Sequence, residues 1–528
     1  MKKTNFLTYI TGWSVVGFFS MGMLFSSCDA GFDSMNIDES AVNELEPMMI
    51  LNNQIQLTPS SGVYGHLLYD VAIVQQIVAP YGQTLAGGNF NQDNQTEWVV
   101  NYYDDDYSLI SHTVDVIENT RGSELYHNVH QMARIWRAFV GLLITDTIGD
   151  APFSEAGLGY HQEILNPSYD SQESIYQTAL QEIREATEAL DPGRRIESTD
   201  ILYAGDITKW KRFGYSLLLR YGMRVSEVAP DLAEQYVEAA YEGGVLESND
   251  DNAMLLRDDN YNFSLSDTFN GGERHNFYLT DVFVNYLRGN NDPRLSSFAV
   301  RYVGAGGIGD QDARLNRSTD PGDQVGIPLG HDQTTIHQQA ESDGLESMWD
   351  YSQVDRDRMV SQHAPDFLIT YAQTQLLLAE AAERGWVPGV SVDYFTEGVN
   401  AHLEQMESHH PDMAIPQSDI DDYVAAQTAA FLAENPYEHI HTQYWVAGFI
   451  ITPREVFSNW RRTGYPQLDP NPYPDQQISG DFIRRRPYLQ REITVNTDNV
   501  QAAIQNQGWS GNNLDARVWW DTETYNPN

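Results

Sequence analysis

Pairs of histidines are the residues in this sequence with the most obvious metal chemistry. His439 and His441 are separated by one residue and His409 and His410 are adjacent, so each pair can supply two ligands to a metal ion. No third ligand follows at helical spacing, and the chain contains a single cysteine. We therefore predict no metal site, and we expect these histidines to lie on the surface.

Clustered acids offer two further kinds of chemistry. Asp104–Asp106 and Asp250–Asp251 could bind calcium, but neither has the spacing of a known calcium loop, so a structural calcium ion has no support and solvated surface is the expectation. A pair of carboxylates can also hydrolyse a glycoside. Because the chain has 75 Asp and Glu, some pair always exists and the sequence nominates none. The G-x-S-x-G and H-E-x-x-H motifs do not occur, and we predict no cofactor.

The glycines at Gly304–Gly309, GAGGIG, satisfy the G-x-G-x-x-G pattern of dinucleotide-binding loops. That function needs a helix directly after the glycines, with its N-terminus facing the pyrophosphate. Residues 310–314, DQDAR, are polar and acidic instead, and their negative charge opposes a phosphate. We predict a flexible loop that binds no nucleotide.

Aromatic side chains in long polar loops are stronger candidates for a binding site. Sugar rings present apolar C–H faces that stack on Tyr, Phe and Trp, while Asn and Gln serve the hydroxyl groups. Segment 81–95 is rich in Gly, Asn and Gln, and segment 245–365 in Gly, Asp, Asn and aromatics; if the two converge in space, their aromatics form one shallow platform. Local packing is the alternative for each aromatic taken alone. The candidate ligand-binding residues are Tyr81, Asn89, Phe90, Tyr261, Phe263, Phe269, Trp349 and Tyr351.

The N-terminus predicts a covalent modification. A basic start precedes a largely apolar stretch, Phe6–Phe25, and two serines then lead to Cys28. This order is typical of a lipoprotein signal peptide, in which cleavage removes residues 1–27 and leaves Cys28 as an acylated N-terminus on a polar tether, residues 28–45. An N-terminal membrane anchor with an incidental cysteine is the alternative.

The composition restricts the partners of the protein. Its 528 residues include 75 acids against 31 Lys and Arg, a formal charge of −44, so the surface repels nucleic acid and anionic lipid headgroups. Apolar residues make up 41%, which is enough for a globular core. We expect no nucleic-acid partner, and a chain this acidic needs acyl groups to remain on a membrane.

Apolar residues at helical spacing predict a mainly α fold, with one domain over residues 46–528 and a loop-rich insertion at about 245–365. The clearest helical pattern is Asp366–Trp386, where Asp366 can cap a helix and Gly385 can end it. A short strand is expected over 298–303. Further helices are expected over 47–57, 64–79, 96–119, 123–148, 171–190, 206–228, 231–242, 277–287, 392–407, 418–434, 452–460 and 499–507.

Several short motifs, and the order in which they occur, resemble those of a known family. The motifs are Thr145-Asp146 with Phe153–Ala156, Lys209-Trp210 with Arg220, Asn291–Arg294, Gly326–Gly330, Asp366–Trp386, Trp460–Pro466 and Trp519–Asp521. From Cys28 onward the chain resembles the SusD/RagB-like nutrient-binding outer-membrane lipoproteins. The tether departs from the family pattern, because Ile37-Asp38-Glu39 stands where prolines are expected.

The resemblance implies degenerate tetratricopeptide-like helix pairs that carry a ligand face built from the insertion loops. It also implies a non-enzymatic lipoprotein of the outer membrane, lipid-anchored at the cell surface, that captures oligosaccharides or peptides. Its implied partner is a SusC-like TonB-dependent transporter, which it covers as a lid. Two alternatives remain: a surface-anchored glycosidase or peptidase, and a structural or adhesive lipoprotein without a small ligand.

Overall fold

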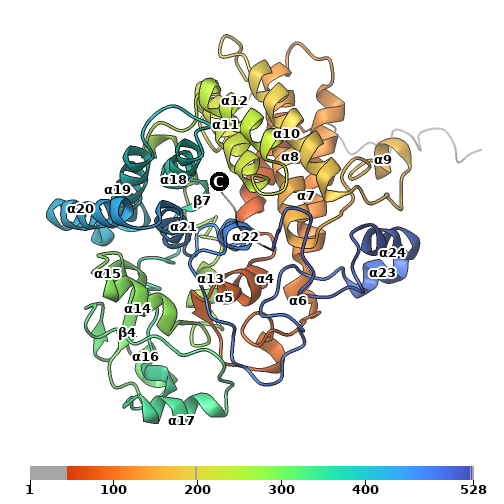
Figure 1. Cartoon of the computed structure of the whole chain (residues 1–528). Coiled ribbons are helices and arrows are strands. Elements are labelled where there is room, and N and C mark those ends of the chain that lie inside the picture. The colour runs from red at the N-terminus through yellow and green to blue at the C-terminus, as the bar shows by residue number, and fades with distance from the viewer. Residues whose placement is uncertain (1–44, 197–198, 524, 526–528) are drawn as a thin grey trace, which may run out of the picture. The chain divides into compact units, whose positions relative to one another are not determined.

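Helices that follow one another in the sequence also lie side by side in space (Figure 1). The computed structural model describes residues 45–196, 199–523 and 525, and residues 47–528 form one unit. The first group of helices packs in chain order around a shared hydrophobic core. It comprises α3 (Pro47–Leu57), α7 (Tyr102–Thr120), α8 (His127–Ile148), α10 (Gln172–Ala189), α11 (Ile207–Arg224) and α12 (Pro230–Gly243).

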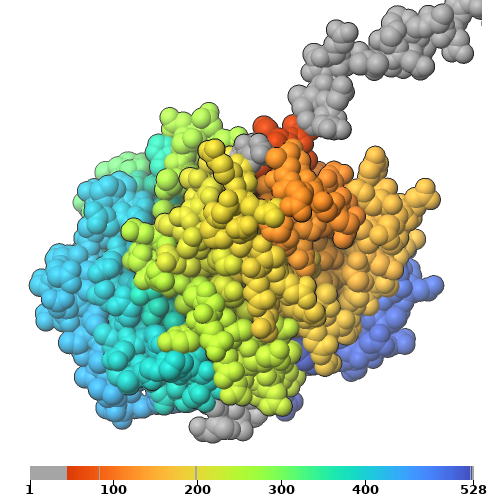
Figure 2. Space-filling model, turned by 90° about the horizontal axis from the view of Figure 1, so that it is seen from above, coloured from red at the N-terminus to blue at the C-terminus, as the bar shows by residue number. Residues whose placement is uncertain are grey.

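A second group of helices follows the loop-rich segment and packs in the same sequential manner. Figure 2 shows one face of the molecule, on which the yellow and green surface of the first group adjoins the cyan and blue surface of the second. Helical pairing of this kind confirms the predicted mainly α fold. The second group comprises α18 (Tyr371–Glu383), α19 (Ser391–His409), α20 (Gln417–Ala433), α21 (Pro436–Ala447) and α22 (Pro453–Thr463).

Side-chain caps explain where several of these helices begin. The Ser171 hydroxyl accepts a hydrogen bond from the Ser174 amide before α10, and the Asp206 carboxylate accepts from the amides of Thr208 and Lys209 before α11. Each cap satisfies amides that have no partner within the helix.

The loop-rich segment, residues 245–365, contains only short elements, as its composition predicted. Strand β4 (Ala299–Tyr302), expected from the sequence, pairs antiparallel with β5 (Arg317–Ser318) and β6 (Gln353–Val354). Strand β3 (Tyr278–Leu279) pairs with β1 (Ile77–Val78), which ties this segment to the N-terminal part of the unit. The short helices of the segment are α13 (Ser266–Asn270), α14 (Asp281–Gly289), α15 (Leu295–Phe298), α16 (Ile308–Asp312) and α17 (Thr335–Ser342).

The remaining short elements lie near the two ends of the unit and in its turns. They are α4 (Val63–Gly65), α5 (Val71–Ile73), α6 (Glu97–Val100), α9 (Gly159–Gln162), α23 (Gln490–Val495), α24 (Thr497–Asn506), a π-helical turn at His66–Asp70, and 3₁₀ turns at Thr58–Ser60, Gln83–Leu85, Asn249–Asp251, Met348–Asp350 and Pro411–Met413.

The prediction of one helix from Asp366 is wrong for its first residues. Asp366–Ile369 form strand β7, which pairs antiparallel with β2 (Ala253–Leu255), and the helix begins only at Tyr371 after the Thr370 cap. The Asp366 carboxylate does not cap a helix but accepts hydrogen bonds from Arg257 Nε and Ser264 Oγ, both at 2.5 Å. Pairing with a strand far away in the sequence thus overrides the local helical pattern.

Other regions also differ from the helix predictions. In the expected helix over 277–287, Tyr278–Leu279 form strand β3, and helix α14 begins only at Asp281. The expected helix over 64–79 divides into α4, the π-helical turn and α5, and the chain reverses at Gln75, which has a φ of 56°, before entering β1. Helix α21 was not predicted, because it is buried on nearly every side and therefore lacks an amphipathic period.

Buried ion pairs join α22 to another helix of its own group and to a helix of the first group. Arg462 of α22 donates two hydrogen bonds to Glu380 of α18, at 2.7 and 2.6 Å, and both side chains are buried. Arg224 of α11 donates to Glu455 of α22 at 2.5 Å. Bidentate pairs of this kind fix the relative orientation of the elements that carry them.

Nothing in the described part of the chain crosses a membrane as a helix, since none of its helices is long and apolar enough. The predicted signal peptide, Cys28 and all but the last residue of the tether lie outside the described residues.

Candidate ligand-binding site

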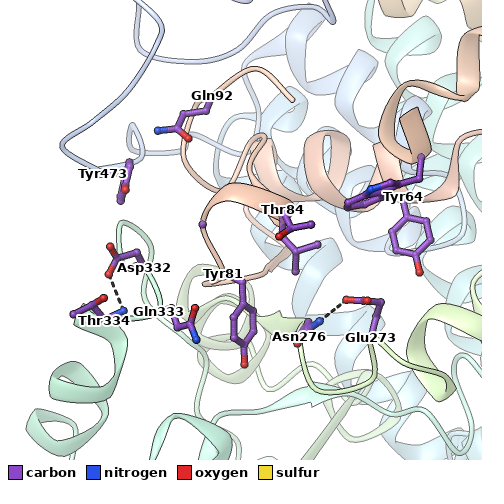
Figure 3. A pocket seen from close by; sticks show the side chains of 13 residues that line it. Tyr64, Tyr81, Thr84, Gln92, Glu273, Asn276, Asp332, Gln333, Thr334 and Tyr473 are labelled. Carbon is purple, nitrogen blue, oxygen red and sulfur yellow. Dashed lines mark hydrogen bonds between the residues drawn. The ribbon is translucent and has the colours of Figure 1, made fainter. Parts of the chain in front are cut away.

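An open pocket of about 1010 Å³ lies where three segments distant in the sequence meet (Figure 3). Residues 64–98, which include the 81–95 segment, and the loop-rich segment both contribute to its wall, so the two candidate segments do converge in space. The third segment is residues 466–480, which we call the C-terminal loop. The pocket is lined by Tyr64, Tyr81, Gly82, Thr84, Leu85, Gln92, Trp98, Glu273, Asn276, Asp332, Gln333, Thr334 and Tyr473.

Four half-buried aromatic rings stand in the wall of the pocket. Trp98 of α6 packs edge-on against Tyr64 of α4, with ring centroids 5.1 Å apart and planes at 79°. Tyr81 points into the space between the segments, and Tyr473 enters from the C-terminal loop (Figure 3). Half burial holds each ring in place and leaves part of its surface available to a ligand.

The C-terminal loop is attached to the 81–95 segment by specific contacts. The ring of Phe90 packs edge-on against Tyr473, with centroids 4.7 Å apart. The side-chain amide of Asn471 donates to the Asn89 carbonyl at 2.8 Å, and its oxygen accepts from the Tyr473 amide at 3.0 Å. The Asn89 side chain in turn donates to the Leu85 carbonyl at 2.9 Å. These contacts position Tyr473 on one side of the pocket.

Two carboxylates and a set of amides supply the polar groups of the pocket. Glu273 accepts a hydrogen bond from the side-chain amide of Asn276. Asp332 accepts from the backbone amides of Thr334 at 3.0 Å and Thr335 at 2.9 Å, so it closes the turn that precedes α17 (Figure 3). Both acids are held by neighbours on their own loops and still face the pocket.

The ionisation of these groups follows from their surroundings. Burial raises the pKa of Tyr81 to about 12, and burial also raises the pKa of Tyr64 and of Tyr473, so all three phenols keep their protons at neutral pH. The backbone amide of Thr335 lowers the pKa of Asp332, which is therefore a carboxylate. None of the described residues that line the pocket is Lys, Arg or His.

This arrangement suits recognition of a polyhydroxylated ligand. The rings can stack on apolar C–H faces, while Gln92, Asn276 and the phenols can donate hydrogen bonds to hydroxyl or carbonyl oxygens. The two acids can accept from hydroxyl groups. Few convergent polar groups around aromatic walls are typical of small-molecule sites.

The structure places the predicted ligand-binding residues at different depths. Tyr81 lies in the pocket, whereas Asn89 and Phe90 lie behind its wall and support Tyr473. Trp349 is half-buried and packs in the same apolar cluster as Tyr81, with its ring 5.3 Å from that of His337. Tyr351 is fully buried in that cluster, where its hydroxyl donates to Asp343.

The other predicted aromatics lie away from the pocket. Phe263 and Phe269 are buried in the core cluster that includes α14 and α22. Tyr261 is 59% exposed and lines a separate groove of about 730 Å³, together with apolar residues such as Met49 and Leu256. The expected single platform therefore does not include these three rings.

Sequence reasoning missed most of the pocket wall. Trp98 was assigned to one face of a helix, and Tyr64 to the start of another, because helical spacing does not show which ring faces a cavity. Tyr473 had a usable signal, since it stands between prolines in the polar run DPNPYPDQQ, where an aromatic ring has no core to enter.

The histidines and clustered acids have structural partners. His409 and His441 are buried, so their predicted surface position is wrong; His441 lies 3.0 Å from the hydroxyl of Tyr525 and 3.5 Å from Glu380. Asp106 pairs with an arginine at 2.8 Å and Asp251 with another at 3.0 Å. Among the described residues, no group of three or more His, Cys, Asp or Glu is placed to hold a metal ion.

Comparison with known proteins is consistent with this geometry. Residues 39–488 match the SusD-like family that is described as starch-binding and associating with the outer membrane. Comparison with curated proteins gave no match.

Solved structures of similar fold cover nearly the whole chain. A chitin-binding protein is 30% identical, with a TM-score of 0.78 over 90% of this chain and 100% of its own. A SusD-like protein from Bacteroidetes is 26% identical, with a TM-score of 0.77 over 91% of this chain and 100% of its own. A SusD homologue from Bacteroides fragilis is 19% identical, with a TM-score of 0.74 over 90% and 100%. Because the family match spans most of the sequence, this chain belongs to the SusD-like family.

Proposed function

We propose that this protein captures an oligosaccharide in the pocket of Figure 3 and does not hydrolyse it. The observation that carries the proposal is the set of four half-buried aromatic rings among amides and phenols in an open pocket of about 1010 Å³. The family description and the chitin-binding structure at 30% identity support a glycan over a peptide as the ligand.

We also propose that the protein is a surface lipoprotein that passes its ligand to a SusC-like TonB-dependent transporter. Association with the outer membrane in the family description supports this location. The order of residues before Cys28 supports an acyl anchor at that cysteine.

Truncation of the pocket aromatics tests the binding proposal. Tyr81→Ala and Trp98→Ala should each weaken oligosaccharide binding about tenfold, since a ring contact contributes about 1–1.5 kcal/mol. The measurement is titration calorimetry with starch-derived and chitin-derived oligosaccharides, beside thermal unfolding of each variant. Tyr160→Ala is the matched control, because Tyr160 is 89% exposed and lies on α9, outside the pocket.

The same titrations distinguish the alternatives. Unchanged affinity in both pocket variants would place the ligand elsewhere on the protein. Release of shorter sugars, detected by chromatography after incubation, would make the protein a glycosidase. Binding of oligopeptides but of no sugar would show that the ligand is a peptide and not a glycan.

A further inference from the structure

The acids of the pocket lie close to its aromatic rings. Glu273 lines the pocket together with Tyr64 and Tyr81, and Asp332 lines it together with Tyr473 (Figure 3). After burial, the negative charge of Glu273 contributes to the raised pKa of Tyr64 and of Tyr81, and that of Asp332 to the raised pKa of Tyr473. The pocket therefore has two places where a carboxylate and an aromatic ring face the same space.

Among the described residues that line the pocket, none is a Lys, Arg or His that could neutralise these carboxylates. Arg274 follows Glu273 in the sequence, but its guanidinium forms a bidentate pair with Asp312, at 2.8 and 3.0 Å. His275, the next residue, lies 3.1 Å from Asp312 and 2.8 Å from Gln311. Both basic side chains are thus engaged outside the pocket wall, and neither lines it.

Two attractive interactions favour a positively charged ligand group in such a place. A cation is attracted to the face of a Tyr or Trp ring by the ring quadrupole, and an adjacent carboxylate adds a Coulomb attraction. The formal charge of −44 also attracts a cationic ligand before it reaches the pocket. A neutral hydroxyl or N-acetyl group gains neither, and a carboxylate on the sugar is repelled.

We propose that the pocket selects oligosaccharides that carry free ammonium groups, namely oligomers of 2-amino sugars whose amines are not acetylated. Glu273 and Asp332 are the residues that confer this selectivity. The inference rests on the proposed function, because it assumes that the pocket binds a sugar chain.

Two conservative substitutions remove the charges and keep the local structure. In Glu273→Gln the new side-chain oxygen can still accept from Asn276, and in Asp332→Asn it can still accept from the Thr334 and Thr335 amides. Asp421→Asn is the control, because Asp421 is an exposed acid on α20 that does not line the pocket.

The experiment compares short oligomers of glucosamine with N-acetylglucosamine, glucose and glucuronate oligomers of the same length. Titration at about pH 6 keeps most of the amines protonated, since an ordinary α-amino group has a pKa of about 8. The glucosamine oligomer should bind tightest and the glucuronate oligomer weakest. Glu273→Gln and Asp332→Asn should each weaken glucosamine binding about fivefold, and change binding of the N-acetylated oligomer less than twofold. Added salt should weaken only the glucosamine complex.

The possible outcomes separate this inference from the function on which it rests. Equal or tighter binding of the N-acetylated oligomer, or equal losses for both sugars in the two variants, would overturn the ammonium selectivity and leave a sugar-binding protein. An equal loss in Asp421→Asn would show that the whole acidic surface, and not the pocket, attracts the amine. Tighter binding of a lysine oligopeptide with the same dependence on Glu273 and Asp332 would make the pocket a site for cationic peptides. Failure of every sugar to bind would contradict the proposed function itself.

Discussion

At the scale of the residue, burial separates the rings that can face a ligand from those that cannot. Tyr81 and Phe90 both stand in one polar loop, yet Tyr81 lines the pocket and Phe90 is 1% exposed. Phe90 acts through Tyr473, against which it packs. A loop aromatic of this kind supports the site without touching the ligand.

Buried histidines link single residues to the pH dependence of stability. Burial lowers the pKa of His66 and of His409 to about 4 and that of His441 to about 3, against an ordinary value of about 6.5. The unfolded chain therefore takes up these protons below about pH 6.5, and the folded protein does so only near pH 4 or below. Since the unfolded state binds more protons in this range, the free energy of unfolding should fall as the pH is lowered from about 6.5 to 4.

The variant His409→Leu tests whether the lowered pKa of His409 contributes to this pH dependence. His409 lies against the ring of Phe367, with centroids 5.3 Å apart, so an apolar side chain can occupy its place. The loss of stability between about pH 7 and 4.5, measured by denaturant unfolding at each pH, should be smaller in the variant than in the parent protein. Comparing the change in stability between the two pH values in each protein, and not the stabilities at one pH, cancels the free-energy cost of repacking around the new leucine. An equal loss in both proteins would show that the pKa of His409 is the same in the folded and unfolded states, and so is not lowered by burial.

At the scale of the element, the closeness of α18 and α19 depends on one glycine. A Cβ added at Gly398 of α19 would lie 2.9 Å from Leu376 Cγ and 3.1 Å from the Ala372 carbonyl oxygen of α18. The small residues of α18, whose Ala372 and Ala379 are fully buried, permit this approach.

Gly398→Ala should therefore destabilise the protein, although the same change usually stabilises a helix by about 1 kcal/mol. Separation of the two helices should outweigh that gain and lower the free energy of unfolding by about 1–3 kcal/mol. Gly289→Ala is the control, because Gly289 ends α14 with nothing within 4 Å of an added Cβ. Denaturant unfolding of both variants gives the comparison. A stabilised Gly398→Ala would mean that α18 and α19 have room to separate.

At the scale of the whole molecule, the acidic surface affects how the protein can be held at a membrane. A formal charge of −44 gives no attraction to anionic headgroups, so the proposed attachment to the membrane would depend on acyl chains, and more than one is needed for a stable anchor. Cys28 is the only cysteine of the chain and the only residue proposed to carry them.

Cys28→Ala should abolish incorporation of a fatty-acid probe and release the protein from the membrane fraction. The thiol is the group that acylation requires, so no other residue can replace it. Metabolic labelling, followed by fractionation and detection of the protein, is the measurement. Ser27→Ala provides a matched control, since it changes the neighbouring residue and retains the thiol. Equal labelling of the cysteine variant and the parent would disprove the anchor.

The mainly α fold, most of the long helices and the family could be predicted from the amino-acid sequence. Helical spacing and the ordered motifs are local features, and local features are retained when the rest of the chain folds. Tyr81 and the two segments that meet at the pocket were candidates in the sequence, because long polar, glycine-rich loops carry binding residues more often than core elements do.

Tertiary structure alone decided which of the loop aromatics are available to a ligand. Three other candidate aromatics stand in polar stretches of the sequence, as Tyr81 does, but contacts with distant elements bury their side chains. They are Phe263, Phe269 and Tyr351. The same kind of distant contact turns Asp366 into a strand residue and brings Tyr473 beside Phe90. The burial of a side chain depends on all of its neighbours in space, so residue spacing within one segment cannot predict it.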